Sequence, residues 1–428
     1  MDYKDLLDRY KKGLVNDEEK KIIEEELKKH EAFEEYMVEN FEDQLSEIKM
    51  DADEKKGTEE TVKLKKNVNR RLRNNIIKSV IIVVLLYVGI FYGVSSIVDS
   101  MYYDPTAKTQ SVKKENQRTD FYYDMQAYVN LNIPGNEVGF ITTEQSKGFG
   151  EYDISYSLSN LFDKTDQRYF ASLTRDGLTS DNIFDGIKSN QNLFGIWDGF
   201  DVITYNLLDG NDKNEEDLTI WGDVIEERNG DTLKYLEELN PLSYISMSIV
   251  FDEDLSMEEF YGDLKMKYPM INFSWVGVRT IPKGERWSEN QPAFLVGFNP
   301  KINLAQSLNE NPDLPNYPLF TLEDFSAKSN ITQEDLYQDV AKAYETHFKS
   351  QLEYIKDQEE FVERFDYNYL KTDFYKDSLA YVNENGVKTY GVLAYATAED
   401  FLEYIDELPY ASIYINEVLP TKPNIYHN

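Results

Sequence analysis

The sequence contains no cysteine, and histidine occurs only three times. The absence of cysteine excludes disulfide bonds, thiolate metal ligands and cysteine nucleophiles. Glycine and proline are also scarce, with 21 and 13 among 428 residues, whereas 41% of the chain is hydrophobic. Such a composition can bury a core and is not that of a disordered chain. We therefore expect more than one folded unit in a chain of this length, stable without covalent cross-links.

Basic residues are few relative to acidic ones, and the formal net charge is −34. Repulsion from phosphate groups opposes binding to DNA or RNA, so we expect no nucleic-acid partner. No catalytic signature surrounds His30, His347 or His427, and no glycine-rich phosphate-binding loop is present. The acidic cluster from Asp252 to Asp254 lacks the spacing of a calcium loop and is interpreted as a solvated loop. We therefore expect no enzyme activity, no cofactor and no metal site.

Long apolar runs are absent apart from one, which extends from Ile76 to Val98 with Lys78 as its only charge. About 20 residues at a rise of 1.5 Å cross a hydrocarbon core of roughly 30 Å, so this run predicts one transmembrane helix. Asp99 and Asp104 are the first charges after it, whereas basic residues crowd its N-terminal side. The positive-inside rule predicts a single-pass protein of the cell membrane with a cytoplasmic N-terminus and an extracellular C-terminal domain. The basic residues that set this topology are Lys63, Lys65, Lys66, Arg70, Arg71 and Arg73.

Within the apolar run, Gly89 and Gly93 form a Gly-x-x-x-Gly motif. This spacing lets two transmembrane helices approach closely. The motif predicts a packing surface for a second copy of the chain or for a second small membrane protein. The alternative is a chance spacing, because glycine is common in transmembrane helices.

Residues 1–50 are too few to bury a core, but their apolar side chains follow the spacing of amphipathic helices. Gly13 ends a first helix, and Asn16 with Glu19 resembles a capping box at the start of a second. Large apolar side chains on so small a module stay partly exposed unless a partner covers them. The segment predicts a docking module, with an inert helical hairpin as the alternative. The candidate docking residues are Leu6, Leu7, Tyr10, Ile22, Ile23, Leu27, Phe33, Met37 and Phe41.

A family resemblance is carried by LLDRYKKGLVNDEEKKIIEEELKKHEAFEEYM, from Leu6 to Met37. This stretch resembles the N-terminal domain of membrane-bound anti-sigma factors, in which a His-Leu-x-x-Cys-x-x-Cys element follows the acidic helix start. If His30 takes the histidine position of that element, Glu34 and Met37 stand at the two cysteine positions. The resemblance therefore implies a member without zinc that is held together by apolar packing, because His30 alone cannot build a tetrahedral zinc site.

In the part after the apolar run, strand and helix patterns alternate. Val129 to Pro134 is expected to form a short strand, and Tyr152 to Leu158 alternates as a strand does. From Leu242 the chain predicts a strand, a helix that Ser256 and Glu259 cap, and a second strand. After helices expected over 332–364 and 367–385, the stretches VKTYGVLAY, TAEDFLEYIDEL and ASIYINEVL repeat the order of strand, capped helix and strand.

These two units, SYISMSIVFDEDLSMEEFYGDLKMKYPMINFSWVGV and KTYGVLAYATAEDFLEYIDELPYASIYINEVLP, resemble the C-terminal domain of the sigma factor regulators of Gram-positive bacteria. The resemblance implies an anti-sigma factor that holds an extracytoplasmic-function sigma factor inactive through its cytoplasmic helices and responds to envelope stress through its outer domain. Release by conformational change and release by proteolysis both remain open. The alternative function is a membrane-anchored cell-wall enzyme or wall-binding module without a transcriptional role.

The expected fold class is α+β, with a short cytoplasmic helical module, one transmembrane helix and extracellular domains of antiparallel or mixed sheets that helices cover. The expected domains are a helical anti-sigma-like module at 1–50, a charged and basic linker at 51–75, the transmembrane helix at 76–98, a juxtamembrane linker at 99–119, a membrane-proximal α+β region at 120–240 and a regulator-like sensor domain at 241–428.

Overall fold

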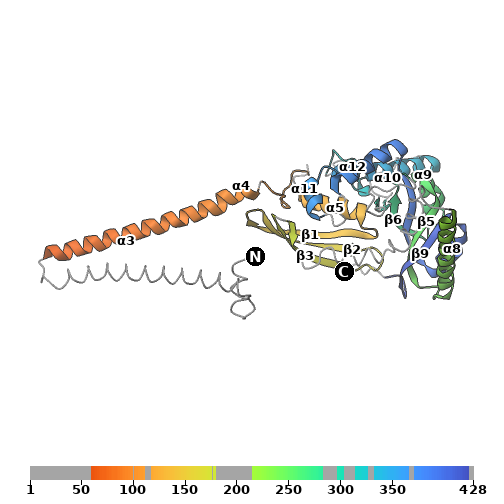
Figure 1. Cartoon of the computed structure of the whole chain (residues 1–428), viewed down its shortest axis with the longest axis horizontal. Helices are drawn as coiled ribbons and strands as arrows, with labels where there is room; N and C mark the ends of the chain where they lie inside the picture. Colours follow the sequence, from red (N-terminus) through yellow and green to blue (C-terminus); the bar gives the residue numbers. More distant parts are fainter. Residues whose placement is uncertain are drawn as a thin grey trace. The chain divides into compact units, whose positions relative to one another are not determined.

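The structure is a computed structural model that describes residues 59–99, 101–110, 117–175, 177–179, 215–282, 296–302, 314–325, 332–365 and 371–423. Its internal contacts divide the chain into two units, Met1–Tyr87 and Val88–Asn428. In the first unit the structure describes helix α3, and the second unit holds both sheets (Figure 1).

Among the described residues, one helix, Lys66–Asp99, is long and apolar enough to cross a membrane. Its large apolar side chains are exposed, with Val83 at 64% and Leu85 at 62% of their surface. A core helix of a soluble protein would bury such side chains, whereas a helix that faces lipid exposes them. The length and composition of this helix agree with the predicted span. It is made of α3 (Glu59–Val88), η1 (Gly89–Val94) and α4 (Ser95–Asp99).

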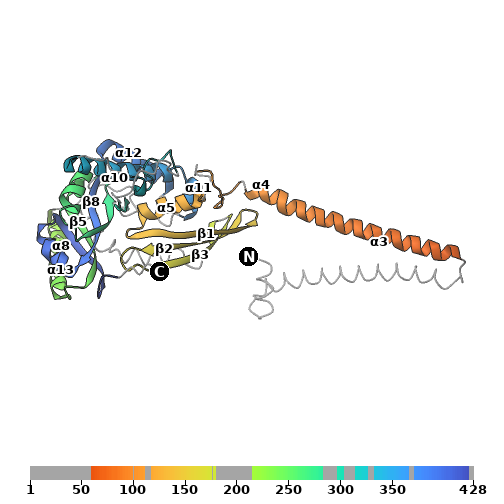
Figure 2. The ribbon, with the colours of Figure 1, turned by 180° about the vertical axis from the view of Figure 1, so that it is seen from behind.

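The first sheet of the second unit has four antiparallel strands in the order β1-β2-β3-β4. Tyr152, Ile154, Tyr156 and Leu158 are buried in the core, which confirms the predicted strand. Helix α5 packs against one face of this sheet (Figures 1 and 2). The elements are α5 (Asp120–Asn132), β1 (Asn136–Gly148), β2 (Glu151–Asn160), β3 (Asp166–Thr174) and β4 (Gly177–Thr179).

Helix α5 corrects one expectation, because the short strand predicted from Val129 to Pro134 is wrong. Val129 belongs to the last turns of α5, whose buried residues include Phe121, Met125 and Tyr128. Their spacing of four and three positions is that of a helix face. The apolar stretch at the end of the helix is too short to display this period alone.

The second sheet has five antiparallel strands in the order β7-β6-β8-β5-β9. Apart from the short edge strand β7, this is the order of a split β-α-β arrangement, in which β8 lies between β5 and β6. The α+β fold class with antiparallel sheets is therefore confirmed. The elements are β5 (Tyr244–Ser256), α9 (Met257–Glu259), η3 (Phe260–Lys265), β6 (Asn272–Val278), β7 (Gly297–Phe298), β8 (Lys388–Thr397), α13 (Ala398–Tyr404), η5 (Ile405–Glu407) and β9 (Tyr410–Leu419).

Capping boxes start the helices that follow the two long strands. The Ser256 side chain accepts from the Glu259 backbone N–H, and the Glu259 carboxylate accepts from the Ser256 backbone N–H at 2.7 Å. Thr397 and Asp400 repeat the arrangement at α13. Each box satisfies backbone donors that have no partner within the helix, so the chain leaves the strand and enters the helix at a defined residue. The predicted box at Ser256 is confirmed.

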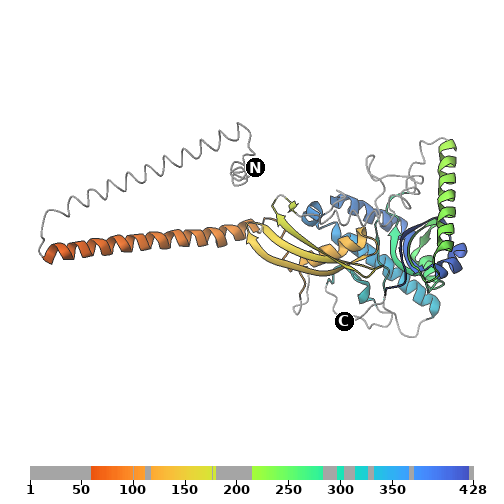
Figure 3. The ribbon, with the colours of Figure 1, turned by 90° about the horizontal axis from the view of Figure 1, so that it is seen from below.

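Further helices surround the second sheet. Helices α10 and α12 pack against each other, and α8 lies along β9 (Figures 1 and 3). One buried apolar cluster contains Phe121 and Tyr156 together with Met247 and Tyr344. Residues on both sides of position 240 therefore share one core. The elements are α8 (Glu215–Glu238), η4 (Leu322–Asp324), α10 (Gln333–Ile355), α11 (Glu359–Phe365) and α12 (Lys371–Asn385).

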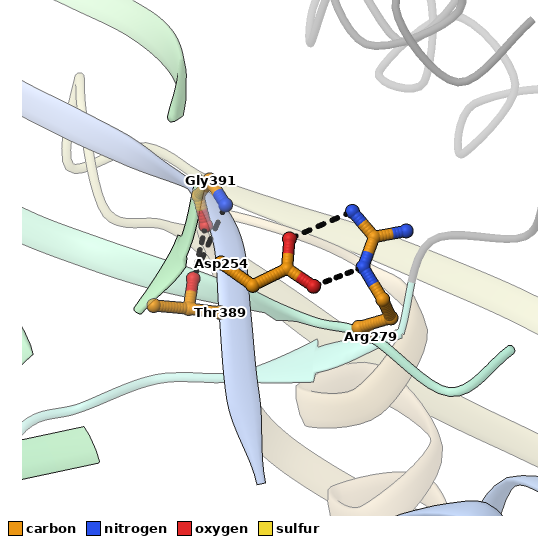
Figure 4. A network of polar contacts seen from close by, with 4 residues as sticks. All are labelled: Asp254, Arg279, Thr389 and Gly391. Atoms are coloured by element: carbon orange, nitrogen blue, oxygen red, sulfur yellow. Dashed lines mark hydrogen bonds and ion pairs between the residues drawn. The ribbon is translucent and has the colours of Figure 1, made fainter. Parts of the chain in front are cut away.

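An ion pair connects β5 to the end of β6 (Figure 4). The Arg279 guanidinium donates from Nη2 to Asp254 Oδ1 at 2.8 Å and from Nε to the other carboxylate oxygen. Arg279 is only 8% exposed, and its guanidinium lies 5.2 Å from the Tyr390 ring centroid. Asp254 therefore belongs to strand β5 and neutralises a buried cation, which corrects the interpretation of this cluster as a solvated loop.

Replacing Asp254 with Asn tests this ion pair. We expect D254N to lower the free energy of unfolding by roughly 3 kcal/mol, because Arg279 then stays buried without a counter-charge. Heat or denaturant unfolding of the full chain in detergent micelles measures the effect. The matched control is D252N, which removes one charge from an exposed position of the same strand and should change stability by less than about 0.5 kcal/mol. Equal effects of the two variants would contradict the assignment.

Candidate functional site

The end of the apolar helix is hydrogen-bonded to the turn between β1 and β2. Ser95 Oγ accepts from the Phe149 backbone N–H at 2.8 Å, and Asp99 Oδ1 accepts from the Gly150 backbone N–H at 2.5 Å. Ser95 also donates to Asp99 at 3.2 Å. The Phe91 ring meets the Phe149 ring edge to face at 6.2 Å. The last turns of this helix and the hairpin therefore form one contact within the second unit.

The backbone of this hairpin turn is unusual. Gly148, Phe149 and Gly150 have φ angles of 86°, 58° and 77°. Positive φ is easy for glycine, but for a bulky residue such as Phe149 it is strained and requires support from its surroundings. The hydrogen bond from Phe149 to Ser95 supplies such support. A Cβ atom at Gly148 would approach Ser95 Oγ to 2.8 Å, so the contact also requires glycine there.

After the helix, Tyr103 enters the core of the second unit. Its hydroxyl donates to Asp124 Oδ2, and the Tyr354 hydroxyl donates to Asp124 Oδ1 at 2.7 Å. Asp124 lies on α5 and has no exposed surface. The Tyr103 ring also contacts Phe121 and Phe361. The stretch expected to be a linker thus contributes a buried residue that joins it to α5 and α10.

The electrostatics of this cluster are those of a buried acid. Burial raises the pKa of the Asp124 carboxyl to about 7, although the hydrogen bonds from Tyr103 and Tyr354 lower it. The negative charge of Asp120 raises it further. Burial of an unpaired carboxylate is costly, so the protein holds this group close to the boundary between its neutral and charged forms.

A cavity of about 660 Å³ lies within the second unit, and its walls come from α5, β1, the chain after β7, the segment around η4, and α10. Its size falls within the range of small-molecule binding sites. Side-chain amides, aromatic rings and both signs of charge line it. Representative lining residues are Tyr122, Gln126, Asn130, Glu137, Asn299 and Gln351.

Asn130 is the centre of a hydrogen-bond network at this cavity. Its Nδ2 donates to Gln351 Oε1 at 2.7 Å and contacts His347 Nε2 at 3.1 Å. Its Oδ1 accepts from the Asn299 backbone N–H at 2.9 Å, and its backbone carbonyl accepts from Trp275 Nε1 at 3.1 Å. These bonds join α5, β6, the chain after β7 and α10, so the wall of the cavity is held in one geometry.

His347 is a neutral member of this network. Burial lowers the pKa of its imidazole to about 4. Its Nδ1 lies 2.7 Å from the Leu319 carbonyl oxygen and donates to it, so Nε2 accepts from Asn130. The imidazole therefore works as a hydrogen-bonding spacer. Among the described residues, no group of three or more His, Asp or Glu side chains could hold a metal ion.

Two elements connect the cavity to the apolar helix. Helix α5 carries Asp124, which binds Tyr103, and also the cavity residues Gln126 and Asn130. Strand β1 begins beside the cavity, which its second residue Glu137 lines, and it ends at the hairpin turn that Ser95 and Asp99 bind. A change in the cavity wall would thus act on β1, which contacts the helix directly, and on α5, which binds Tyr103 just after the helix.

Comparison with known families gives a match for most of the second sheet and for the helices between its strands. Residues 236–411 match the family described as sigma factor regulator C-terminal. The chain therefore carries a sigma factor regulator domain. No curated protein and no solved structure matches the chain. This match supports the resemblance drawn from the two β-α-β units and a role as a regulator of a sigma factor.

The sigma factor regulator domain supplies half of the cavity wall. Asn299, His347 and Gln351 belong to it, whereas Gln126 and Asn130 come from α5, before the matched residues. Sequence reasoning did not find these cavity residues. Isolated Asn and Gln residues carry no spacing signal, and they meet only because α5 packs between the two sheets.

The residues proposed from sequence fall into three groups. The docking candidates, from Leu6 to Phe41, lie outside the described residues. Gly89 and Gly93 lie in η1, and a Cβ atom at either would meet nothing within 4 Å in the described part of the chain outside the neighbouring turns of the helix itself. The basic residues lie on α3. Their roles in docking, helix packing and topology stay predictions.

The opposite shifts of Asp124 and His347 predict opposite pH effects. The folded protein binds the Asp124 proton up to about pH 7, against about 4 when unfolded, so the penalty for burying its charge grows as pH rises through this window. We therefore expect D124N to become more stable relative to the wild type as pH rises from about 4 to about 7. Thermal unfolding of the full chain in micelles across this range measures the difference.

His347 gives the reverse trend. Because its folded pKa of about 4 lies below the ordinary 6.5, the wild type loses stability as pH falls through this interval, and H347Q should reduce that loss. The control is D153N, which removes an exposed carboxylate whose pKa the Lys147 ammonium lowers. Unfolding profiles of D124N and H347Q that run parallel to the wild type would rule out the assigned protonation states.

Proposed function

We propose that the chain is a membrane-bound anti-sigma factor. Its N-terminal helices sequester an extracytoplasmic-function sigma factor, and its outer domain responds to envelope stress. The observation that carries the proposal is a sigma factor regulator C-terminal domain on a chain with one helix apolar enough to span a membrane. A regulator of a cytoplasmic protein needs a route across the membrane when its sensing domain lies outside.

The topology that this function needs is supported by charge. The basic residues on α3, among them Arg70, Arg71 and Arg73, precede the apolar run, and Asp99 follows it. Basic segments stay on the cytoplasmic side, so residues 1–75 are proposed to be cytoplasmic and the sheets extracellular. The envelope of a Gram-positive bacterium fits this arrangement and a chain without cysteine. Gly89 and Gly93 are proposed to pack against a second copy or a small membrane protein.

Signal transmission is proposed to use the contact between the apolar helix and the hairpin turn. Ser95 and Asp99 hold the strained turn at Phe149, and Tyr103 ties the following chain to Asp124. A ligand that favours one arrangement of α5 and β1 would thereby favour one arrangement of the helix. A shift of this kind would lower the affinity of the N-terminal helices for the sigma factor or expose the chain to proteolysis.

Co-purification tests the proposal. The full chain, solubilised from cells in detergent, should retain one extracytoplasmic-function sigma factor of the same organism through washing. Capture of none of these sigma factors would overturn the proposal. Deletion of residues 2–60 should raise transcription from the promoters of the captured factor. If deletion leaves transcription unchanged, a wall-anchored module becomes the better assignment.

Replacing Leu27 and Phe33 with Asp tests the docking face. We expect the double variant to lose repression, because two charges would be buried against the partner. A promoter reporter measures repression, and immunoblotting of membranes checks insertion. In the control, Lys21 and Lys28 become Asp; the helical period places them opposite the apolar stripe, and the change in charge is larger. Repression that survives L27D/F33D would show that the docking face is elsewhere.

The helix-to-hairpin contact gives a second functional prediction. In the double variant S95A/D99N, the Phe149 backbone N–H loses its acceptor and the Gly150 backbone N–H keeps only a weaker one. The sensor domain should then no longer act on the helix. We expect basal repression to persist while induction by cell-wall stress falls several-fold.

The reporter with and without a wall-active antibiotic measures this response. The matched control is D104N, because the Asp104 carboxylate accepts from Thr106 in an exposed turn and lies just beyond the helix. Full induction in S95A/D99N at normal protein abundance would disprove transmission through this contact.

A further inference from the structure

The cavity beside α5 has the chemistry of a specific ligand site. Its wall combines the side-chain amides of Gln126, Asn136 and Gln351 with the aromatic ring of Tyr122. Every amide carries both donors and an acceptor, which suits hydroxyl and amide groups of a ligand. Gln351 and Asn136 already have partners within the protein, but an acyl chain would offer the Gln126 amide no hydrogen bond, and a buried amide without a partner costs binding free energy. The lining therefore opposes a lipid tail.

The charges at the cavity oppose an anionic ligand. Lys301 lies 3.5 Å from the Glu137 carboxylate, and Arg118 lies over the Tyr122 ring at 3.9 Å. Glu323 adds a further acid to the lining. Both cations are thus already engaged and the acids outnumber them, so a phosphate or carboxylate ligand would meet no surplus of positive charge.

The shape of the site is held before any ligand arrives. Asn130 is fixed through Gln351, His347 and the Asn299 backbone, and the Asn299 side chain donates to Glu137 at 2.9 Å. A preorganised wall loses little conformational entropy on binding. Aromatic side chains beside fixed amides and carboxylates suit a pyranose ring, which has an apolar face of C–H groups and an edge of hydroxyl groups.

We propose that this cavity binds a short neutral saccharide that carries hydroxyl or acetamido groups. The inference rests on the proposed function in one respect, namely that the saccharide would be the signal of the outer domain. Binding in the cavity would act on α5 and on β1, which lead to Tyr103 and to the hairpin turn.

Isothermal titration calorimetry of the full chain in detergent micelles tests the binding. The probes are tri-N-acetylchitotriose, cellotriose and maltotriose, with inorganic phosphate and tri-alanine amide as comparators. We expect at least one neutral saccharide to bind with a Kd of about 1 mM or tighter, and phosphate and the peptide not to bind. Absence of binding by all three saccharides, or preferential binding of phosphate or the peptide, overturns the proposal.

Variants locate the site. Q126W places a large ring in the cavity and should weaken saccharide binding at least about tenfold, a loss of roughly 1.4 kcal/mol. The matched control N385W adds the same ring at an exposed position at the end of α12 and should bind like the wild type. Q126A changes the same position but leaves the cavity open. The thermal unfolding temperature of each variant is measured, and the binding of variants that match the wild type in this temperature is compared. Unchanged affinity in Q126W would contradict the assigned site.

The two proposals can fail separately. Saccharide binding to the purified chain needs no sigma factor, and co-purification of a sigma factor needs no saccharide. If the saccharide binds but does not change the promoter reporter in cells, the cavity is a saccharide site without a role as the signal receptor. If the reporter responds in the wild type but not in Q126W, both proposals are supported.

Discussion

The buried carboxyl group of Asp124 is the interaction on which the arrangement of the second unit depends. It joins Tyr103, just after the apolar helix, to Tyr354 of the sigma factor regulator domain, through a helix that precedes that domain. A buried acid must be hydrogen-bonded or neutral, and two phenol donors meet that need only when all three chain segments come together. Three segments far apart in sequence are thus committed to one geometry.

In this arrangement helix α5 contributes residues to two sites. It carries Asp124, which binds Tyr103 just after the apolar helix, and it also carries Gln126 and Asn130, which line the cavity. Strand β1 has a similar double role, with Glu137 at the cavity and Gly148 at the hairpin turn. Rigid elements that touch both sites are what coupling between them requires, since a packed core moves in discrete steps.

Local signals predicted much of the sigma factor regulator domain. Ser256 and Glu259 define a capping box within four residues, and the alternation from Ile245 to Phe251 predicts the strand, although both of its faces are buried. The prediction failed at Val129, where a short apolar stretch belongs to a helix, and at Asp254, whose partner Arg279 lies 25 positions away. The first prediction failed because so short a stretch does not display the helical period, and the second because a tertiary contact decided it.

The sequence by itself determined the apolar span, the basic flank, the capped helices and the two β-α-β units, because each depends on neighbours within a few positions. Only the tertiary structure decided that Tyr103 enters the core, that Ser95 and Asp99 hold the hairpin turn, and that Asn130 and Gln351 meet at a cavity. Hydrogen bonds between residues as many as 230 positions apart leave no periodic trace in the chain. They exist because burial forces polar groups from separate elements to satisfy one another.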